Sequence, residues 1–316
     1  MLKQNVPLKD FSNYKIGGEA LYFLNAETEQ ELTEGIREWQ AVSKALPENE
    51  RKIFILGGGT NILFSDAGFK GLVIKNCLGS ITVNENEIVV GAGTLISKLC
   101  DFCIDYSLSG FEWAGGLPGT VGGAVRGNAG AFGKETKDNV VSVTSLNLKT
   151  LDIVKRSNQE CSFSYRSSIF KTIATDEVII SAVLGFKNGN KEEIEKSVKE
   201  KVEFRKSRHP LENPNAGSVF KNVPFDSIQD QYKNELQQYV KNDPFPVVPS
   251  AKIIFLTGLK GKRVGDAMVS EKHTNFIVNS GNATAKDVSD LIQIIKDQVK
   301  QKYGIALEEE IMRLDQ

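Results

Sequence analysis

The chain has 316 residues, which is enough for two or three domains. Its formal net charge is −1, so the chain lacks the excess of basic residues that would favour nucleic acid or an anionic membrane as a partner. No apolar run approaches the roughly 18 residues of a transmembrane helix, and the first residues lack a signal-peptide pattern. We therefore expect a cytoplasmic protein that would need a local cluster of cations to bind an anionic ligand.

The first half of the chain is rich in glycine and in short apolar runs. These runs predict strands at 53–56, 72–74, 88–90, 140–148 and 178–186. Apolar residues at helical spacing predict a helix over 94–106, with Thr94 as its N-cap. Cys100 and Cys103 form a C-x-x-C pair in this helix, which can be redox-active or half of a zinc site. Because no second pair exists, we interpret them as buried helix cysteines and predict no metal site.

The second half alternates charged helical segments with loops. The amphipathic, glycine-free segment 191–208 predicts a helix that links two domains. Further on, we expect a polar helix at 227–241, a short apolar segment at 251–256, a strand at 275–278, a helix at 285–303 and a strand at 305–314.

Two glycine-rich segments carry the chemistry of the first half. The first is ILGGGTNILFSD, residues 55–66, where a triple glycine directly follows a strand. Consecutive glycines let backbone N–H groups converge on a phosphate, although a tight turn uses the same residues. The segment has neither the G-x-G-x-x-G nor the Gly-Lys-Ser/Thr pattern, so it is not a Rossmann fingerprint or a P-loop.

The second segment is GFEWAGGLPGTVGGAVRGNAGAFG, residues 110–133, in which nine residues are glycine. A flexible linker can also be glycine-rich, but Trp113, Leu117, Val121 and Phe132 are too apolar for one. The combination predicts backbone packed closely against a large flat ligand and its pyrophosphate.

Several further motifs accompany these two segments in a fixed order along almost the whole chain. They are YKIGG (14–18), YRSSIFK (165–171), AGSVFKN (216–222), VSEKHTNFI (269–277) and LEEEI (307–311). Together the chain resembles the UDP-N-acetylenolpyruvoylglucosamine reductases (UDP-N-acetylmuramate dehydrogenases). These belong to the FAD-binding superfamily of the PCMH, or vanillyl-alcohol-oxidase, type. Ser218 follows Arg166 by only 52 positions, which resembles the form of the family that lacks an extra tyrosine loop.

The resemblance implies an α+β fold, with a two-subdomain PCMH-type FAD-binding region and an α+β substrate-binding domain. We expect FAD-binding subdomains at 1–75 and 76–190 and a UDP-sugar domain at 200–302. A C-terminal strand, 303–316, should return to the FAD region. A polar insert, about residues 226–245, is either a lid or a solvated excursion, and we favour the excursion.

The resemblance also implies the reaction: reduction of UDP-N-acetylglucosamine enolpyruvate to UDP-N-acetylmuramate, with non-covalent FAD and with NADPH as reductant. Hydride passes from reduced flavin N5 to the enolpyruvyl group. The product serves peptidoglycan synthesis, and so cell shape and division. We expect a monomer, with no nucleic-acid partner and no membrane insertion.

The family's catalytic trio corresponds to Arg166, Ser218 and Glu310. Arg166 and a protonated Glu310 would stabilise the enolate that forms at the substrate carboxylate. Ser218 would then protonate the carbanionic carbon. Without the resemblance, Glu310 in a run of three glutamates reads as a solvated surface residue.

The remaining site residues also follow from the matching motifs. Substrate contacts are expected from Lys221, Glu271 and Asn275. Residues expected to bind FAD are Gly57, Gly58, Gly59, Thr60, Asn61, Gly115, Gly116, Leu117, Pro118, Gly119, Thr120, Gly122, Gly123, Asn128, Ala129 and Gly130.

Two alternative functions remain open. One is a sugar or alcohol oxidase of the same superfamily, and the other is a flavin protein without catalysis that acts as a redox sensor or scaffold.

Overall fold

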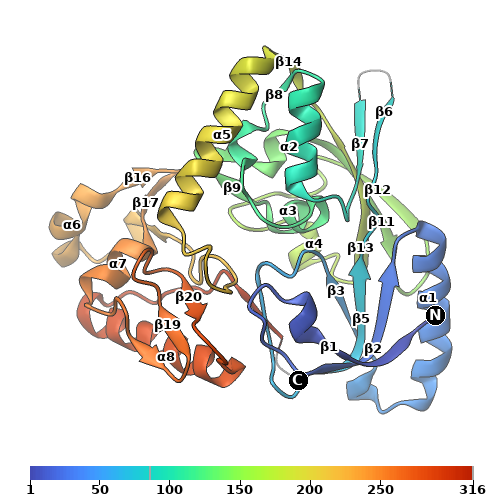
Figure 1. The fold of residues 1–316 in the computed structure, drawn as a ribbon, viewed down its shortest axis with the longest axis horizontal. Helices are drawn as coiled ribbons and strands as arrows, with labels where there is room; N and C mark the ends of the chain where they lie inside the picture. Colours follow the sequence, from blue (N-terminus) through green and yellow to red (C-terminus); the bar gives the residue numbers. More distant parts are fainter. Residues whose placement is uncertain (85–86, 315–316) are drawn as a thin grey trace. The chain divides into compact units, whose positions relative to one another are not determined.

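A computed structural model describes residues 1–84 and 87–314 of the chain (Figure 1). The chain forms two compact units, and each is described by itself. Unit 1 contains Met1–Val6, Ala20–Gly58 and Lys70–Arg205. Unit 2 contains Pro7–Glu19, Gly59–Phe69 and the chain from Lys206 onward. The finer division at residues 75 and 190, and the return of the C-terminal strand to an FAD region, stay predictions.

Unit 1 is built around two sheets (Figure 1). The first has the order β1-β2-β5-β3 and comprises β1 (Lys3–Pro7), β2 (Glu19–Ala26), β5 (Phe69–Asn76) and β3 (Lys52–Leu56). The second has the order β12-β11-β13-β7-β6 and comprises β12 (Ile153–Ser157), β11 (Val140–Asn147), β13 (Glu177–Leu184), β7 (Glu87–Gly91) and β6 (Ile81–Asn84). Two short antiparallel pairs join β8 (Leu108–Ser109) to β14 (Lys187–Asn188) and β9 (Gly130–Ala131) to β10 (Lys134–Glu135). The strands predicted from apolar runs are confirmed, with small shifts at their ends.

The helices begin in unit 1 with α1 (Glu29–Val42), α2 (Ile96–Asp105), α3 (Val121–Gly127), α4 (Ile169–Thr172) and α5 (Lys191–Arg208). Thr94 is not the N-cap that the sequence suggested, because its hydroxyl donates to the Ser80 carbonyl at 3.1 Å and the helix begins two residues later. Cys100 and Cys103 are buried on α2, as expected, and burial raises the pKa of both thiols.

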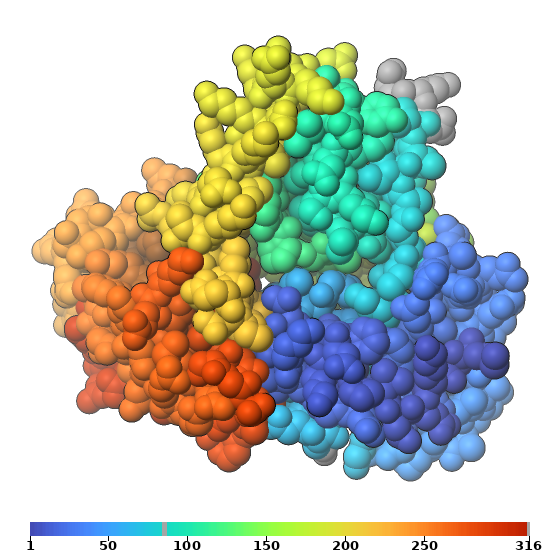
Figure 2. Space-filling model, viewed as in Figure 1, coloured from blue at the N-terminus to red at the C-terminus, as the bar shows by residue number. Residues whose placement is uncertain are grey.

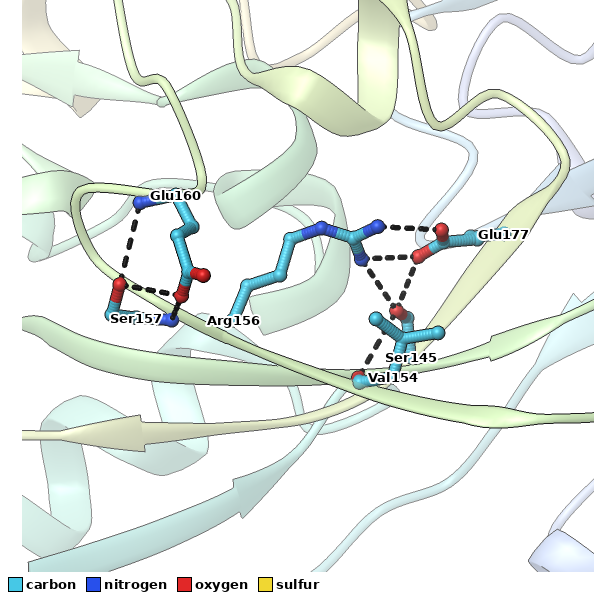
Figure 3. A network of polar contacts seen from close by, with 6 residues as sticks. All are labelled: Ser145, Val154, Arg156, Ser157, Glu160 and Glu177. Carbon is cyan, nitrogen blue, oxygen red and sulfur yellow. Dashed lines mark hydrogen bonds and ion pairs between the residues drawn. The ribbon is translucent and has the colours of Figure 1, made fainter.

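A buried ion pair ties together the three neighbouring strands β11, β12 and β13 (Figure 3). Arg156 on β12 donates two hydrogen bonds to Glu177 on β13, at 2.5 Å and 2.8 Å. The hydroxyl of Ser145, on β11 between them, donates to the same carboxylate at 2.5 Å. The side chain of Glu177 is only 8% exposed, so this pair is shielded from water.

Helix α5 has the bounds that the sequence predicted, and it is a largely exposed helix. In the space-filling view its yellow surface is open along much of its length (Figure 2). Only Ile194, Val198 and Arg205 are buried on it. Among the described residues, no helix is long and apolar enough to cross a membrane.

Unit 2 combines short strands with three α-helices that pack on one apolar core. Its strands are β4 (Ile62–Phe64), β15 (Val223–Pro224), β16 (Lys241–Asn242), β17 (Pro246–Val248), β18 (Arg263–Val264), β19 (Ala267–Val269), β20 (Ile277–Asn279) and β21 (Met312–Leu314). Its helices are α6 (Asp230–Leu236), α7 (Ser250–Leu256) and α8 (Ala285–Tyr303). The prediction of α8 is confirmed at both ends, where Thr284 forms a capping box and Gly304 adopts the left-handed conformation.

Short 3₁₀ helices complete both units. They lie at Leu8–Phe11, Ser43–Ala45, Glu48–Glu50, Glu112–Ala114, Thr136–Asp138, Phe225–Ser227 and Gln237–Tyr239. One of them, with α6, replaces the single long helix expected over 227–241.

The apolar segment 251–256, which the sequence assigned to neither a helix nor a strand, lies in helix α7, where Ile253 and Ile254 face the core of unit 2. Two other expectations for unit 2 need correction. The C-terminal strand is limited to β21, which pairs in parallel with β4. The polar insert is not a solvated excursion, since Ile228 and Leu236 are buried in the core of unit 2.

Candidate active site

Arg166 stands in a strained turn of unit 1. Ser164 and Ser167 exchange two backbone hydrogen bonds across it, at 3.0 Å and 3.1 Å. Arg166 itself has φ 55°, a conformation that non-glycine residues rarely adopt. Such strain is retained where the surrounding structure fixes a side chain for a purpose.

The same turn is bound to the end of the second glycine-rich segment. Nη2 of Arg166 donates to the Gly130 carbonyl at 3.0 Å, and Nδ2 of Asn128 donates to the Ser164 carbonyl at 2.9 Å. Asn128 is fully buried and ends α3 in the left-handed conformation. Thus two residues predicted to bind FAD hold the residue predicted to be the catalytic cation.

The two glycine-rich segments meet at Gly57 and Thr120. A Cβ atom on Gly57 would lie 2.8 Å from the Thr120 hydroxyl, the one atom of the described residues within 4 Å of it apart from its chain neighbours. A Cβ on Gly123 would lie 3.6 Å from the same hydroxyl. In the described part of the chain, the backbone amides of Gly58, Gly59 and Thr60 donate to no protein acceptor. Within unit 1, the space beside Gly57 and the amide of Gly58 leave room and a donor for an anionic ligand.

Other predicted FAD glycines serve close packing of the protein instead. A Cβ on Gly115 would lie 2.6 Å from the Val198 carbonyl on α5, and one on Gly122 would lie 2.8 Å from Ala92 Cβ. The Gly122 amide already donates to the Ala92 carbonyl at 2.8 Å. Glycine at these positions is therefore explained by the fold without a ligand.

Arg205 is a buried cation that sequence reasoning missed. Its Nε donates to the Gly115 carbonyl at 2.9 Å, and its guanidinium lies 5.4 Å from the Phe132 ring centroid. Among the described residues no carboxylate forms an ion pair with it, and burial lowers its pKa. A buried positive charge without a counter-ion beside a glycine-rich segment favours an anionic ligand there.

In unit 2, the segments that carry Ser218 and Glu310 pair with each other. The Glu310 amide donates to the Val219 carbonyl at 2.8 Å, and the Lys221 amide donates to the Glu308 carbonyl at 2.9 Å. Phe220 and Glu309 are the bridged pair between them. Two residues predicted from motifs far apart in the sequence thus lie in neighbouring backbone segments.

The predicted substrate residues of unit 2 have different surroundings. Lys221 forms an ion pair with Glu308, whose side chain is 71% exposed. Asn275 is 3% exposed, and both ends of its side-chain amide bind the Phe220 backbone. Glu271 lines a cavity of about 550 Å³.

This cavity gathers cations and aromatic rings. Four lysines line it, together with Tyr239, Phe255 and His273; the lysines are Lys241, Lys252, Lys260 and Lys272. Nζ of Lys252 lies 4.3 Å from the Tyr239 ring centroid and 4.7 Å from that of Phe255. Burial lowers the pKa of His273 to about 4, so it is neutral near pH 7 and adds no charge. A lining of lysines and rings suits a nucleotide with its phosphates.

Comparison with known proteins decides the family. A family model described as an FAD binding domain matches residues 32–150. A second, described as the C-terminal domain of UDP-N-acetylenolpyruvoylglucosamine reductase, matches residues 209–314. The reductase of that name from Caldanaerobacter subterraneus is 38% identical over 97% of this chain and 91% of its own length. The chain belongs to the UDP-N-acetylenolpyruvoylglucosamine reductase family.

Other members of the reductase family agree over the full length. The Clostridium tetani reductase is 35% identical over 98% of this chain and 91% of its own. The crystal structure of the Thermus caldophilus reductase superposes with a TM-score of 0.76 at 30% identity, covering all of both chains. The chain is accordingly an α+β flavin-dependent oxidoreductase of peptidoglycan synthesis.

FAD is the cofactor of this reductase family, and NADPH is its reductant. The residues of unit 1 fit FAD, because the close approach of Gly57 to Thr120, the amide of Gly58 and the uncompensated Arg205 suit a flat anionic dinucleotide. The individual FAD contacts predicted from the motifs remain predictions.

The sequence analysis did not single out Lys241 and Lys252 of the unit 2 cavity, although each stands two or three positions from an aromatic residue.

Proposed function

We propose that the protein reduces UDP-N-acetylglucosamine enolpyruvate to UDP-N-acetylmuramate in the cytoplasm, with NADPH as the reductant. The observation that carries the proposal is the backbone pairing of the Ser218 and Glu310 segments, because it brings a hydroxyl and a carboxyl from two motifs into one neighbourhood. Bound FAD would supply the hydride that adds to the terminal carbon of the enolpyruvyl double bond.

The roles of the trio follow from the charge that the substrate develops. As the terminal carbon gains hydride, negative charge spreads from the neighbouring carbon into the carboxylate. Arg166 stabilises that charge as a fixed planar cation, and Glu310, in its protonated form, donates a hydrogen bond to it. Ser218 gives its proton to the carbanionic carbon and regains one from solvent. Among the described residues nothing hydrogen-bonds the Ser218 hydroxyl, which supports its availability.

The cavity of unit 2 supports the nucleotide part of the substrate. Its four lysines supply positive charge for a diphosphate, and Tyr239 and Phe255 supply flat apolar surface. Glu271 provides an acceptor in the same lining. We propose that this cavity holds the uridine diphosphate.

An anaerobic stopped-flow experiment tests the function. NADPH should bleach the flavin absorbance, and UDP-N-acetylglucosamine enolpyruvate should restore it in the absence of oxygen. Bleached flavin that recovers only with oxygen would indicate an oxidase instead. A flavin that NADPH does not bleach would indicate a sensor or scaffold.

The Ser218→Ala variant tests the serine. Reduction of the flavin by NADPH should remain near the wild-type rate, while reoxidation by substrate should slow by about 10²–10⁴-fold. Equal slowing of both half-reactions would show that Ser218 is only structural.

A further inference from the structure

The segment from Val219 to Lys221, directly after Ser218, has its backbone held from several sides. The Val219 carbonyl and the Lys221 amide bind the 308–310 segment. The Lys221 carbonyl accepts from the Ser250 hydroxyl. The remaining polar groups, the Val219 amide and both groups of Phe220, bind Asn275.

Asn275 therefore makes more of these bonds than any other residue. Its own carbonyl accepts from the Val219 amide at 2.8 Å. Its side-chain Oδ1 accepts from the Phe220 amide at 3.0 Å, and its Nδ2 donates to the Phe220 carbonyl at 2.8 Å. The side-chain amide thus copies the pairing of a neighbouring strand, which needs a donor and an acceptor on one planar group.

The burial of Asn275 argues against its predicted contact with the substrate. The residue is 3% exposed, and each polar atom of its side chain is already bound to Phe220. Phe220 itself is 1% exposed, so removing the amide would leave two buried backbone groups unsatisfied. The loop would then relax, beginning two residues from Ser218.

We propose that Asn275 is a positioning residue that fixes Ser218 in its proton-donating place, and not a substrate ligand. This inference rests on the proposed function, in which Ser218 donates the proton. When a proton donor moves by about 1 Å, the reaction slows by roughly 10²-fold. The hydrogen bonds of Asn275 therefore affect the reaction rate and not the substrate affinity.

A double-mutant cycle tests the inference. Asn275→Asp keeps the shape and the acceptor but loses the donor to Phe220. We expect it to slow substrate-dependent reoxidation of the flavin by about 10–10²-fold, with the substrate Kd of the oxidised enzyme within twofold of wild type. In the Ser218→Ala background the same change should have no further effect, because the group that it positions is gone.

The control is Asn279→Asp, on β20, the strand that begins two residues after Asn275. Asn279 is 4% exposed, and its Nδ2 donates to the Tyr14 carbonyl at 3.1 Å and not to residues 219–221. It should lower the Tm as Asn275→Asp does and leave the reoxidation rate unchanged. If Asn275→Asp is too unstable to measure, Asn275→Gln, which keeps both groups but displaces them, should show the same non-additivity.

Three results would overturn the inference. A substrate Kd that rises with the loss of rate would make Asn275 a ligand. Full slowing of the Ser218→Ala enzyme by the second change would show that Asn275 acts elsewhere. Equal slowing by Asn279→Asp would reduce the effect to general instability. If Ser218→Ala alone reoxidises at the wild-type rate, the proposed function fails first, and the two failures are thereby distinguished.

Discussion

The amide of Glu310 donates to the carbonyl of Val219 at 2.8 Å, one residue beyond Ser218. Phe220 is bridged to Glu309, so the run of three glutamates lies along residues 219–221, the loop that follows Ser218. Alternation along an extended segment sends Glu309 to the face opposite Glu310. Glu309 indeed binds Lys296 on α8, while the exposed Glu308 forms an ion pair with Lys221.

Three glutamine variants should therefore behave differently. Glu310→Gln should slow substrate-dependent flavin reoxidation sharply, by roughly 10²-fold or more, because it removes an acid aimed at the enolate. Glu308→Gln should change turnover and stability little. Glu309→Gln should lower the Tm, since its ion pair with Lys296 is 18% exposed on the carboxylate side, but keep turnover. Three variants with equal turnover would show that the C-terminal segment is only structural.

Gly217, before the serine, should not tolerate alanine. Its φ is 79°, which costs a residue with a Cβ about 1–2 kcal/mol, although no atom of the described residues beyond its chain neighbours lies within 4 Å of the added carbon. Gly127→Ala is the matched control, because its Cβ also meets nothing within 4 Å but its backbone is helical. Urea unfolding should show Gly217→Ala destabilised and Gly127→Ala neutral or more stable. Equal free energies of unfolding would contradict the strain.

Loss of the Arg205 charge should weaken FAD binding. Arg205→Met keeps most of the apolar stem but removes the bond to Gly115 and the buried charge, so the apoprotein should bind FAD about tenfold more weakly. Lys201→Met is the control, because Lys201 also lies over the Phe132 ring, at 5.2 Å, but makes no bond to Gly115. Flavin fluorescence titration measures both. Unchanged affinity in Arg205→Met would assign the arginine to packing alone.

FAD should leave the protein when it unfolds. Neither histidine, His209 or His273, lies in the glycine-rich segments, so no histidyl linkage is expected. Acid or heat should release all of the yellow colour into a protein-free filtrate. Flavin that stays with the denatured chain would require a covalent bond.

Glu177 should make stability depend on acid pH. Burial alone raises the pKa of its carboxyl, but the hydrogen bonds from Arg156 and Ser145 outweigh burial and lower the pKa. The stabilisation is complete above the unfolded pKa of about 4.3 and is lost as the pH falls through the lower, folded pKa. Glu177→Gln should abolish this loss of stability at low pH and destabilise the protein by roughly 3 kcal/mol near pH 7.

Glu160, in the same network view, is the control for Glu177 (Figure 3). Its pKa is also lowered, by hydrogen bonds from Ser157, but its carboxyl is exposed to water. Glu160→Gln should therefore leave unfolding nearly unchanged. Thermal unfolding from pH 3 to pH 7 compares the two, and parallel curves for both variants would contradict the role of burial.

Local patterns in the sequence predicted the elements that local forces form. Helix α8 has the predicted bounds because apolar spacing and capping residues act within a few positions. Helix α5 also has the predicted bounds, but it lacks the amphipathic pattern that the sequence suggested and buries Ile194, Val198 and Arg205. The expected strand over 305–314 was too long: β21 covers Met312–Leu314, and Glu309 makes an isolated bridge to Phe220, a partner that no pattern near either segment encodes.

The residues of the candidate site also fall into two groups: those that local motifs predicted and those that only the folded structure shows. Motifs named Ser218 and Glu310, and the structure places their segments side by side. They did not name Arg205, Lys241 or Lys252, since burial without a counter-ion and the lining of a cavity arise only when distant segments meet. Asn275 was named from its motif, but its hydrogen bonds with Phe220 depend on a loop 55 positions earlier.

Unit 2 is composed of early and late parts of the chain, so during synthesis its core cannot form until the late part has left the ribosome. Tyr14, Ile16 and Leu63 are buried in a core whose other members all follow residue 215. At about 5–20 residues per second, Leu63 emerges roughly 12–50 s before Ile311. Through that interval these early apolar segments lack their core, so the nascent chain should be most prone to chaperone binding and proteolysis there.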